Sequence, residues 1–262
     1  MSIKYFDLSF QIYIYFLTFV LGAVMGSFLN CCAYRICHNM PISKGRSECD
    51  NCKHLLGPLD LIPLVSYLIS GGKCRYCGKH ISIRYPLTEL ISGLLYCLIV
   101  YKFEISLETI KYLVLISCLL CASFADIEDF LIPDRLIVIV LINRIIFILL
   151  SDDILSELLN SVIGALCITV PLIILVIVMS KVMKREAMGG GDIKLFFMIG
   201  SYFPVLENLL ALLISCFIGL LFATITKQKD NEFPFGPSIC VAYFITLMVG
   251  SYILSSYFSL FL

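Results

Sequence analysis

The chain has 262 residues, of which 60% are hydrophobic and 15% are charged, and its formal net charge is zero. Soluble globular domains carry about 25% charged residues, so this composition excludes a soluble domain and predicts an integral membrane protein. A chain with no net positive charge has no overall attraction to nucleic acid, so we expect no nucleic-acid partner.

Apolar segments long enough to cross the roughly 30 Å hydrocarbon core of a membrane recur along the chain. The first, residues 10–30, is interpreted as a retained anchor because a long polar segment follows it and no small-residue cleavage site is evident. Within it, Gly22-x-x-x-Gly26 predicts a close contact with another helix. The other candidate spans are residues 87–101, 109–126, 134–150, 157–180, 193–203, 205–226 and 236–261.

These segments predict an all-α polytopic membrane protein, a bundle of about eight transmembrane helices with a small cytoplasmic zinc-binding insertion. Residues 193–203 are short for a span, and Pro204 separates them from residues 205–226. These two segments could therefore form one broken helix or a re-entrant pair instead of two spans.

The polar segment after the first span contains two cysteine knuckles, each a Cys-x-x-Cys motif, with 21 residues between them. Four thiolates at this spacing are typical of a structural zinc site. Two disulfides are the alternative, but thiols stay reduced in the cytoplasm, where we expect this loop to lie. The other cysteines are expected to pack as small hydrophobic residues, although Cys118-x-x-Cys121 also has the form of a redox pair. The predicted zinc ligands are Cys49, Cys52, Cys74 and Cys77.

Between the knuckles, residues 55–69 are apolar but interrupted by a glycine and two prolines. The segment is too short and too broken to span a membrane. We expect it to pack against the membrane surface or against the bundle.

Lysines and arginines concentrate in residues 31–86, which hold eight of the 19 basic residues of the chain. By the positive-inside rule this segment is a cytoplasmic loop. Threading the spans in order then puts the loops around residues 127–134 and 181–192 on the same face, and both termini outside.

The third predicted span ends at Asp126, and an aspartate in a membrane segment is a functional hypothesis by default. Glu128, Asp129 and Asp134 follow it and are rivals for any catalytic role. Alternatively, these three are solvated loop charges, with Asp134 capping a helix that starts at Arg135.

A second carboxylate, Asp192, follows three glycines where a helix is expected to begin. Glycines disfavour a helix, so a structural role explains the run poorly. We interpret Gly189, Gly190 and Gly191 as a sharp turn that lets substrate backbone approach a catalytic carboxylate. The topology places Asp192 on the same face as Asp126. Two carboxylates that share a proton can activate water and protonate a leaving group, which predicts amide hydrolysis without a metal.

These features together resemble the type IV prepilin peptidases, membrane aspartic proteases of the GxGD type, and the resemblance covers nearly the whole chain. In chain order it is carried by Gly26-Ser27-Phe28-Leu29-Asn30 with Tyr34-Arg35, the two cysteine knuckles, Arg84-Tyr85-Pro86-Leu87-Thr88-Glu89, Asp126 with Ile132-Pro133-Asp134, Gly189-Gly190-Gly191-Asp192-Ile193-Lys194-Leu195, and Pro234-Phe235-Gly236-Pro237.

The resemblance implies a bifunctional enzyme of the bacterial plasma membrane whose active site faces the cytoplasm. Such enzymes remove the short leader from pilin-like precursors of type IV pili, competence pseudopili or type II secretion pseudopilins. Many then methylate the new N-terminus with S-adenosylmethionine. The domains it implies are the first transmembrane helix, residues 1–30, a zinc-binding loop associated with methyl transfer, residues 31–86, and the peptidase bundle, residues 87–262.

Residue by residue, Asp126 and Asp192 match the catalytic pair of that family. Lys194 lies in the same motif and could shift the titration of Asp192 or contact a carbonyl group. The candidate residues for cofactor binding and methyl transfer, which could instead position the loop, are Gly26, Asn30, Arg35 and Glu89.

Other functions stay open at this point. Without a glycine-rich dinucleotide fingerprint, the chain could be a peptidase alone. A transporter would also carry intramembrane carboxylates and broken helices, and a zinc-loop scaffold would need no chemistry. A preflagellin-type or presenilin-like protease is the nearest enzyme alternative, and the cysteine knuckles argue against it.

Overall fold

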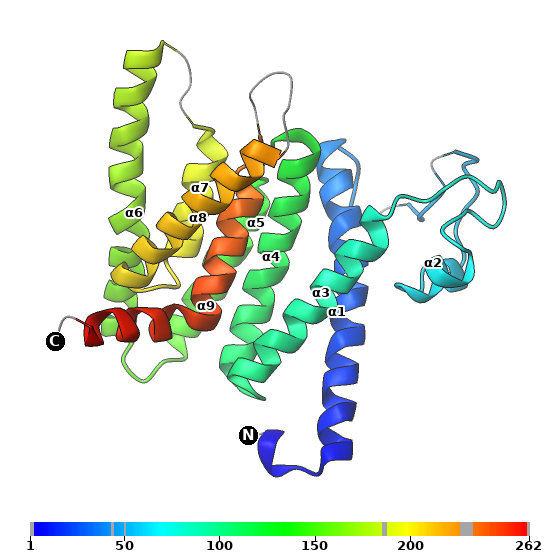
Figure 1. The fold of residues 1–262 in the computed structure, drawn as a ribbon, viewed down its shortest axis with the longest axis horizontal. Coiled ribbons are helices and arrows are strands. Elements are labelled where there is room, and N and C mark those ends of the chain that lie inside the picture. Colours follow the sequence, from blue (N-terminus) through cyan, green and yellow to red (C-terminus); the bar gives the residue numbers. More distant parts are fainter. Residues whose placement is uncertain (1–2, 43–44, 50, 185–187, 226–232, 261–262) are drawn as a thin grey trace. The chain divides into compact units, whose positions relative to one another are not determined.

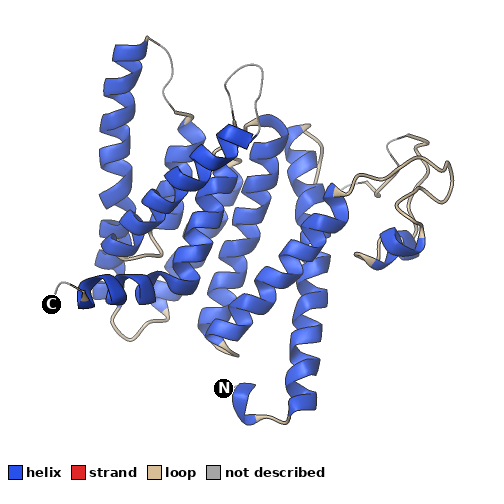
Figure 2. Ribbon diagram, in the orientation of Figure 1, coloured by secondary structure: helices blue, strands red, loops and turns tan. Residues whose placement is uncertain are grey.

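The structure is a computed structural model that describes residues 3–42, 45–49, 51–184, 188–225 and 233–260. Residues 185–187 of the predicted loop 181–192, and the last residue of the predicted spans 205–226 and 236–261, lie outside this description. The described residues form helices and loops and no extended strand (Figure 2). The elements are η1 (Ile3–Tyr5), α1 (Leu8–Cys37), η2 (Pro58–Asp60), α2 (Val65–Ile69), α3 (Arg84–Phe103), α4 (Leu107–Asp129), α5 (Asp134–Leu149), α6 (Ile154–Met183), α7 (Gly190–Gly200), α8 (Val205–Ile225) and α9 (Gly236–Ser259) (Figure 1).

Six helices of the described residues are long and apolar enough to cross a membrane: α1, α3, α4, α6, α8 and α9. The chain is therefore an all-helical protein with several candidate membrane spans, as its composition predicts. Helix α5 has 16 residues and α7 has 11, and neither is among the six. The predicted count of about eight spans is thus not confirmed.

The chain divides into two compact units, Met1–Cys121 and Ala122–Leu262, with the boundary inside α4. In the first unit α1 packs along α3. A Cβ atom on Gly22 would lie 2.8 Å from the Cα atom of Gly93, and one on Gly26 would lie 2.6 Å from the Cβ atom of Ser92. Only glycine allows so close an approach, which confirms that the Gly22-x-x-x-Gly26 motif marks a helix contact.

In the second unit the short helix α7 is the buried centre. The side chains of Leu195, Phe196, Met198 and Ile199 have no exposed surface, and α5, α6 and α9 contact this helix. The segment 193–203, predicted as a possible span, is therefore covered by protein on most of its surface. Its hydrophobicity reflects a protein core as much as a lipid environment.

The far end of α7 is held by the amide of Asn208, in the first turn of α8. Its Nδ2 atom lies 3.2 Å or less from the carbonyl oxygens of Gly164, Gly200 and Phe203, and its Oδ1 atom accepts a hydrogen bond of 2.9 Å from the Tyr243 hydroxyl. One buried amide thus joins α6, α7, α8 and α9, as satisfied buried polar networks do.

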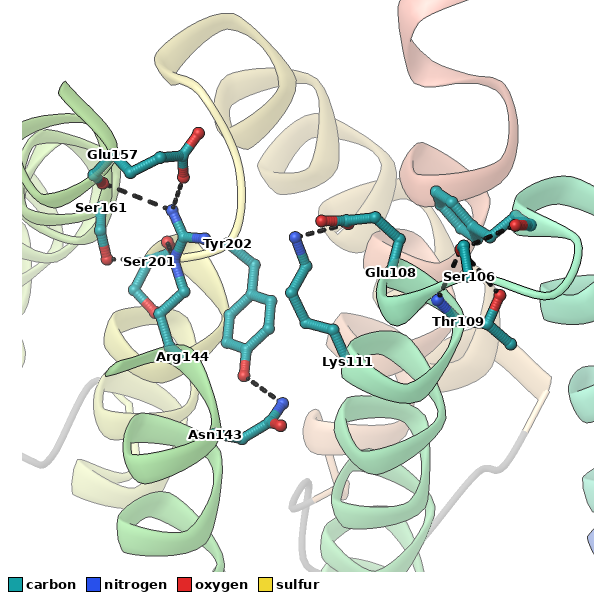
Figure 3. Close-up of polar contacts among 11 residues, drawn as sticks. Ser106, Glu108, Thr109, Lys111, Asn143, Arg144, Glu157, Ser161, Ser201 and Tyr202 are labelled. Carbon is teal, nitrogen blue, oxygen red and sulfur yellow. Dashed lines mark hydrogen bonds and ion pairs between the residues drawn. The ribbon is translucent and has the colours of Figure 1, made fainter. Parts of the chain in front are cut away.

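A second buried network surrounds Arg144 of α5 (Figure 3). The guanidinium group donates to the carbonyl oxygen of Ser201 over 2.9 Å and pairs with Glu157 of α6 over 2.8 Å. The neighbouring Asn143 donates to the Tyr202 hydroxyl over 2.8 Å. These contacts link α5 and α6 to the turn between α7 and α8.

Candidate active site and metal site

Asp126 lies in the last turn of α4 and is only 5% exposed. Its Oδ2 atom accepts a hydrogen bond of 2.8 Å from the backbone N–H of Gly236, the first residue of α9. A Cβ atom on Gly236 would lie 2.8 Å from the same oxygen, so a side chain there would displace the carboxylate. The Gly236 contact was not predicted from the sequence, and its only signal is the glycine of Pro234-Phe235-Gly236-Pro237.

Asp192 is the third residue of α7 and is half-buried. Burial raises the pKa of its carboxyl group to about 7, and the negative charge of Asp126 contributes to the rise. The two carboxylates therefore lie within electrostatic reach of each other, where the end of α4 meets the first turns of α7 and α9. The structure brings the predicted pair together inside one compact unit.

The three glycines before Asp192 do not form the sharp turn expected of them. None of them has a positive φ, and Gly189, which precedes α7, has φ −65° and ψ 138°. That part of the interpretation was wrong. Their small size matters instead: a Cβ atom on Gly191 would lie 3.2 Å from the Cβ atom of Ile132, and one on Gly190 would meet nothing within 4 Å. The open side at Gly190 is compatible with the approach of a substrate backbone.

Asp134 does not cap the helix that follows it. It is the first residue of α5, whose N-cap is Pro133, and its Oδ1 atom lies 2.7 Å from the Nζ atom of Lys194. The predicted cap is wrong because the carboxylate is turned toward this lysine, and both side chains are exposed. Lys194 thus pairs with Asp134. The causes of the raised pKa of Asp192 are burial and the charge of Asp126, and Lys194 is not among them.

The other two rivals of Asp126 are more exposed than it is. Asp129, at the end of α4, is exposed, and Glu128 is partly exposed. The degree of burial is therefore enough to distinguish Asp126 from Glu128 and Asp129.

The four predicted zinc ligands come together in the first unit. Their Sγ atoms all lie within 4.8 Å of one another, and those of Cys49 and Cys77 are 3.9 Å apart. A tetrahedral zinc ion with bonds of about 2.3 Å holds sulfur atoms about 3.8 Å apart, so this set fits the metal. All thirteen cysteines, Cys118 and Cys121 included, are free thiols, and no disulfide joins the knuckles.

The described residues of the two knuckles make the same backbone hydrogen bonds. The N–H of Cys49 donates to His54 and that of Lys53 to Cys49, just as Cys74 donates to Lys79 and Gly78 to Cys74. The fourth residue after each first cysteine, Lys53 or Gly78, has a positive φ. Each turn therefore presents its two sulfur atoms in the same way.

A side chain links one knuckle to the other. The Nδ2 atom of Asn51 lies 3.6 Å from the Sγ atom of Cys77, and its Oδ1 atom accepts 3.0 Å from the Lys79 ammonium. Backbone hydrogen bonding from Lys79, with the Asn51 contact, lowers the pKa of the Cys77 thiol to about 6. The thiolate form that binds a metal is thereby favoured.

The four residues predicted for methyl transfer all lie in the first unit. Gly26 is at the α1–α3 contact, and Asn30 is buried one turn further along α1. The Arg35 guanidinium donates to the carbonyl oxygens of Ile42, over 2.9 Å, and Gly45, over 3.1 Å. These hydrogen bonds are those expected of the alternative role, in which Arg35 positions the loop.

Glu89 is 8% exposed, and its Oε2 atom accepts a hydrogen bond of 2.7 Å from the backbone N–H of Leu64. Leu64 has a positive φ and directly precedes α2. Glu89 therefore fixes the start of α2 to α3, and its part in cofactor binding stays a prediction.

Comparison with known proteins matches both halves of the chain. Residues 20–103 match the bacterial peptidase A24 N-terminal domain, and residues 113–224 match the type IV leader peptidase family. The chain is similar to proteins named prepilin leader peptidase/N-methyltransferase. That of Bacillus subtilis (strain 168) is 33% identical over 246 residues, which cover 91% of this chain and 96% of the relative. That of Neisseria gonorrhoeae is 31% identical, with 86% and 87% covered. No solved structure matches.

Proposed function

Because this chain belongs to the type IV leader peptidase family and is a peptidase, we propose that it removes the leader from pilin-like precursors and then methylates the new N-terminus. The substrates would be precursors of pili, competence pseudopili or type II secretion pseudopilins. The peptidase would act at the cytoplasmic face of a bacterial plasma membrane, in a bundle of about eight spans. The basic residues of the loop 31–86 support this orientation.

The observation that carries the peptidase proposal is the pairing of Asp126 and Asp192 beside the Gly236 N–H group. The two carboxyl groups share one proton and one negative charge, which the Gly236 amide and the N-terminal end of α7 stabilise. The ionised carboxylate takes a proton from water, and the resulting hydroxide attacks the scissile carbonyl carbon. The protonated carboxyl group gives its proton to the leaving amine.

The position of the pair suits the substrate. Asp126 lies in the last turn of the candidate span α4 and Asp192 in the first turn of α7, so both are close to helix ends. A scissile bond between a polar leader and an apolar helix would lie at the same boundary between water and lipid. The substrate would enter laterally from the bilayer.

Methyl transfer is assigned to the first unit, with the zinc-binding loop of residues 31–86 and the contact of α1 with α3. Bound S-adenosylmethionine supplies an activated methyl group on a positively charged sulfonium. Asn30 and Glu89 are buried polar groups of α1 and α3, and the Glu89 carboxylate suits a positive ligand. Gly26 and Arg35 complete the proposed set, and the four cysteines would hold Zn²⁺, which would contribute much of the folding free energy of the loop.

The test is a cleavage assay with the purified protein in liposomes and a synthetic pilin-like precursor, read by mass spectrometry. Asp126→Ala and Asp192→Ala should each leave the leader attached, whereas Asp129→Asn, at an exposed carboxylate on the same helix as Asp126, should cleave. A mass gain of one methyl group only with S-adenosylmethionine would support methyl transfer. Full cleavage by either alanine variant would rule out the carboxylate pair.

A further inference from the structure

The loop between α1 and α3 carries an apolar surface that no described residue of its unit covers. On α2, Val65, Leu68 and Ile69 are 45%, 76% and 71% exposed. Their spacing places them on one face of the helix. Leu59 and Leu61, 66% and 44% exposed, continue the surface in and after η2. An apolar surface of this kind marks a site of interaction with a partner or a membrane.

Three contacts fix this surface within the loop. The carboxylate of Asp60, at the end of η2, accepts from the Tyr76 hydroxyl over 3.1 Å and lies 3.4 Å from the Arg75 guanidinium, so η2 is attached to the second knuckle. On the inner side of α2, Tyr67 packs against Gly72. Contacts on the opposite side of these elements therefore hold the exposed face in place.

The depth of α2 follows from its hydrogen bond to Glu89. Glu89 is five residues after the first residue of α3, a distance of about 8 Å along that helix. The N–H of Leu64, directly before α2, is 2.7 Å from its carboxylate. Amphipathic helices that lie in a membrane interface bury their apolar face by about 5–10 Å. The tether thus holds the start of α2 beside the second turn of α3, at a distance along that helix similar to this burial depth.

We propose that the exposed face formed by Leu59, Leu61, Val65, Leu68 and Ile69 docks into the lipid interface beside α3 and so anchors the zinc-binding loop on the membrane. The occupant is lipid because the surface is joined to the candidate spans α1 and α3, and Glu89 holds the start of α2 beside the second turn of α3. Five residues of α2 cannot cross a bilayer, so the helix lies along it. In Figure 1 the loop with α2 extends away from α1 and α3.

The experiment uses the absence of tryptophan from the chain, because a single introduced indole is then the only one. The full-length protein with bound zinc carries Leu68→Trp and is reconstituted in bilayers with or without brominated acyl chains, which quench indole fluorescence on contact. The matched control is Glu48→Trp, at an exposed residue of the first knuckle. Leu68→Trp should emit at shorter wavelength than the control and lose most of its intensity in brominated lipid, while the control should lose little.

The tether is tested in the same background. Adding Glu89→Leu, which removes the acceptor, should reduce the quenching of Leu68→Trp, whereas Glu89→Gln, which keeps a carbonyl acceptor, should preserve it. Short-wavelength emission without quenching would show that protein covers the surface, and long-wavelength emission would show that water does. Either result would overturn the lipid assignment.

Discussion

In the loop of residues 31–86, two short turns each hold their own pair of cysteines, whereas the carboxylate pair depends on helices from distant parts of the chain. Each knuckle fixes its sulfur atoms by hydrogen bonds within a few residues. Asp126, Asp192 and Gly236 meet only because α4, α7 and α9 end or begin at one place. The comparison teaches that the four-cysteine cluster, which could hold a metal ion, depends on local backbone, and that the pair of Asp126 and Asp192 depends on the packing of the second unit.

The largest effect is expected from loss of a zinc ligand. Cys52→Ala removes one of the four ligands and should abolish zinc binding. The effect is large because structural zinc contributes about 10–16 kcal/mol of apparent binding free energy in small domains. Metal analysis and limited proteolysis of residues 45–82 would measure the effect. Cys216→Ala, at an exposed cysteine of α8, is the control and should retain one zinc per chain. Stoichiometric zinc in Cys52→Ala would contradict the four-cysteine site.

At the carboxylate pair, the largest loss of cleavage is expected from a methyl group added at Gly236. Gly236→Ala puts a Cβ atom 2.8 Å from Asp126 and removes the carboxylate from its place, so kcat/KM for precursor cleavage should fall by about 100-fold. Gly190→Ala, which meets nothing within 4 Å, should cause a smaller loss. Equal losses would mean that the Gly236 contact does not position Asp126.

Between the two knuckles, Asn51 offers a finer test of the local site. Asn51→Ala removes the contacts with Cys77 and Lys79 but leaves all four thiols, so zinc affinity should fall by about 10- to 100-fold. Competition with a chelator would measure this. An unchanged affinity would show that the knuckle backbones alone determine zinc binding.

The smallest effect is the pH response of cleavage. The raised pKa of Asp192 means that the shared proton is kept as pH rises toward about 7 and is lost above it. The value of kcat/KM should therefore fall above pH 7, approaching tenfold per pH unit. If kcat/KM does not change between pH 6 and pH 9, loss of this proton does not control the reaction.

Much of this organisation could be predicted from local patterns. Hydropathy located most of the long helices, and the Cys-x-x-Cys spacing identified the four thiols because each knuckle is a local turn. The position of Asp126 at the end of the third predicted span also favoured it over its neighbours before any contact was known. The catalytic roles of Asp126 and Asp192 themselves stay predictions.

The rest required the fold. Hydropathy cannot tell whether lipid or protein covers an apolar helix, so α7 was indistinguishable from a short span. The expected cap by Asp134 failed because Lys194, far along the chain, lies beside it. The Gly236 contact was missed because a backbone N–H has no sequence signature of its own.

The last two turns of helix α7 are more deeply buried than its first turn. Asn208 and a fully buried core grip its last two turns, while Asp192 lies on the half-buried first turn. The first turn, which carries the carboxylate, is therefore the less densely packed end of the helix. A small bend of the first turn of α7 would let the two carboxyl groups separate for a peptide and close on it again without disturbing the core. Amide protons near Gly190 should therefore exchange with solvent long before those near Gly200.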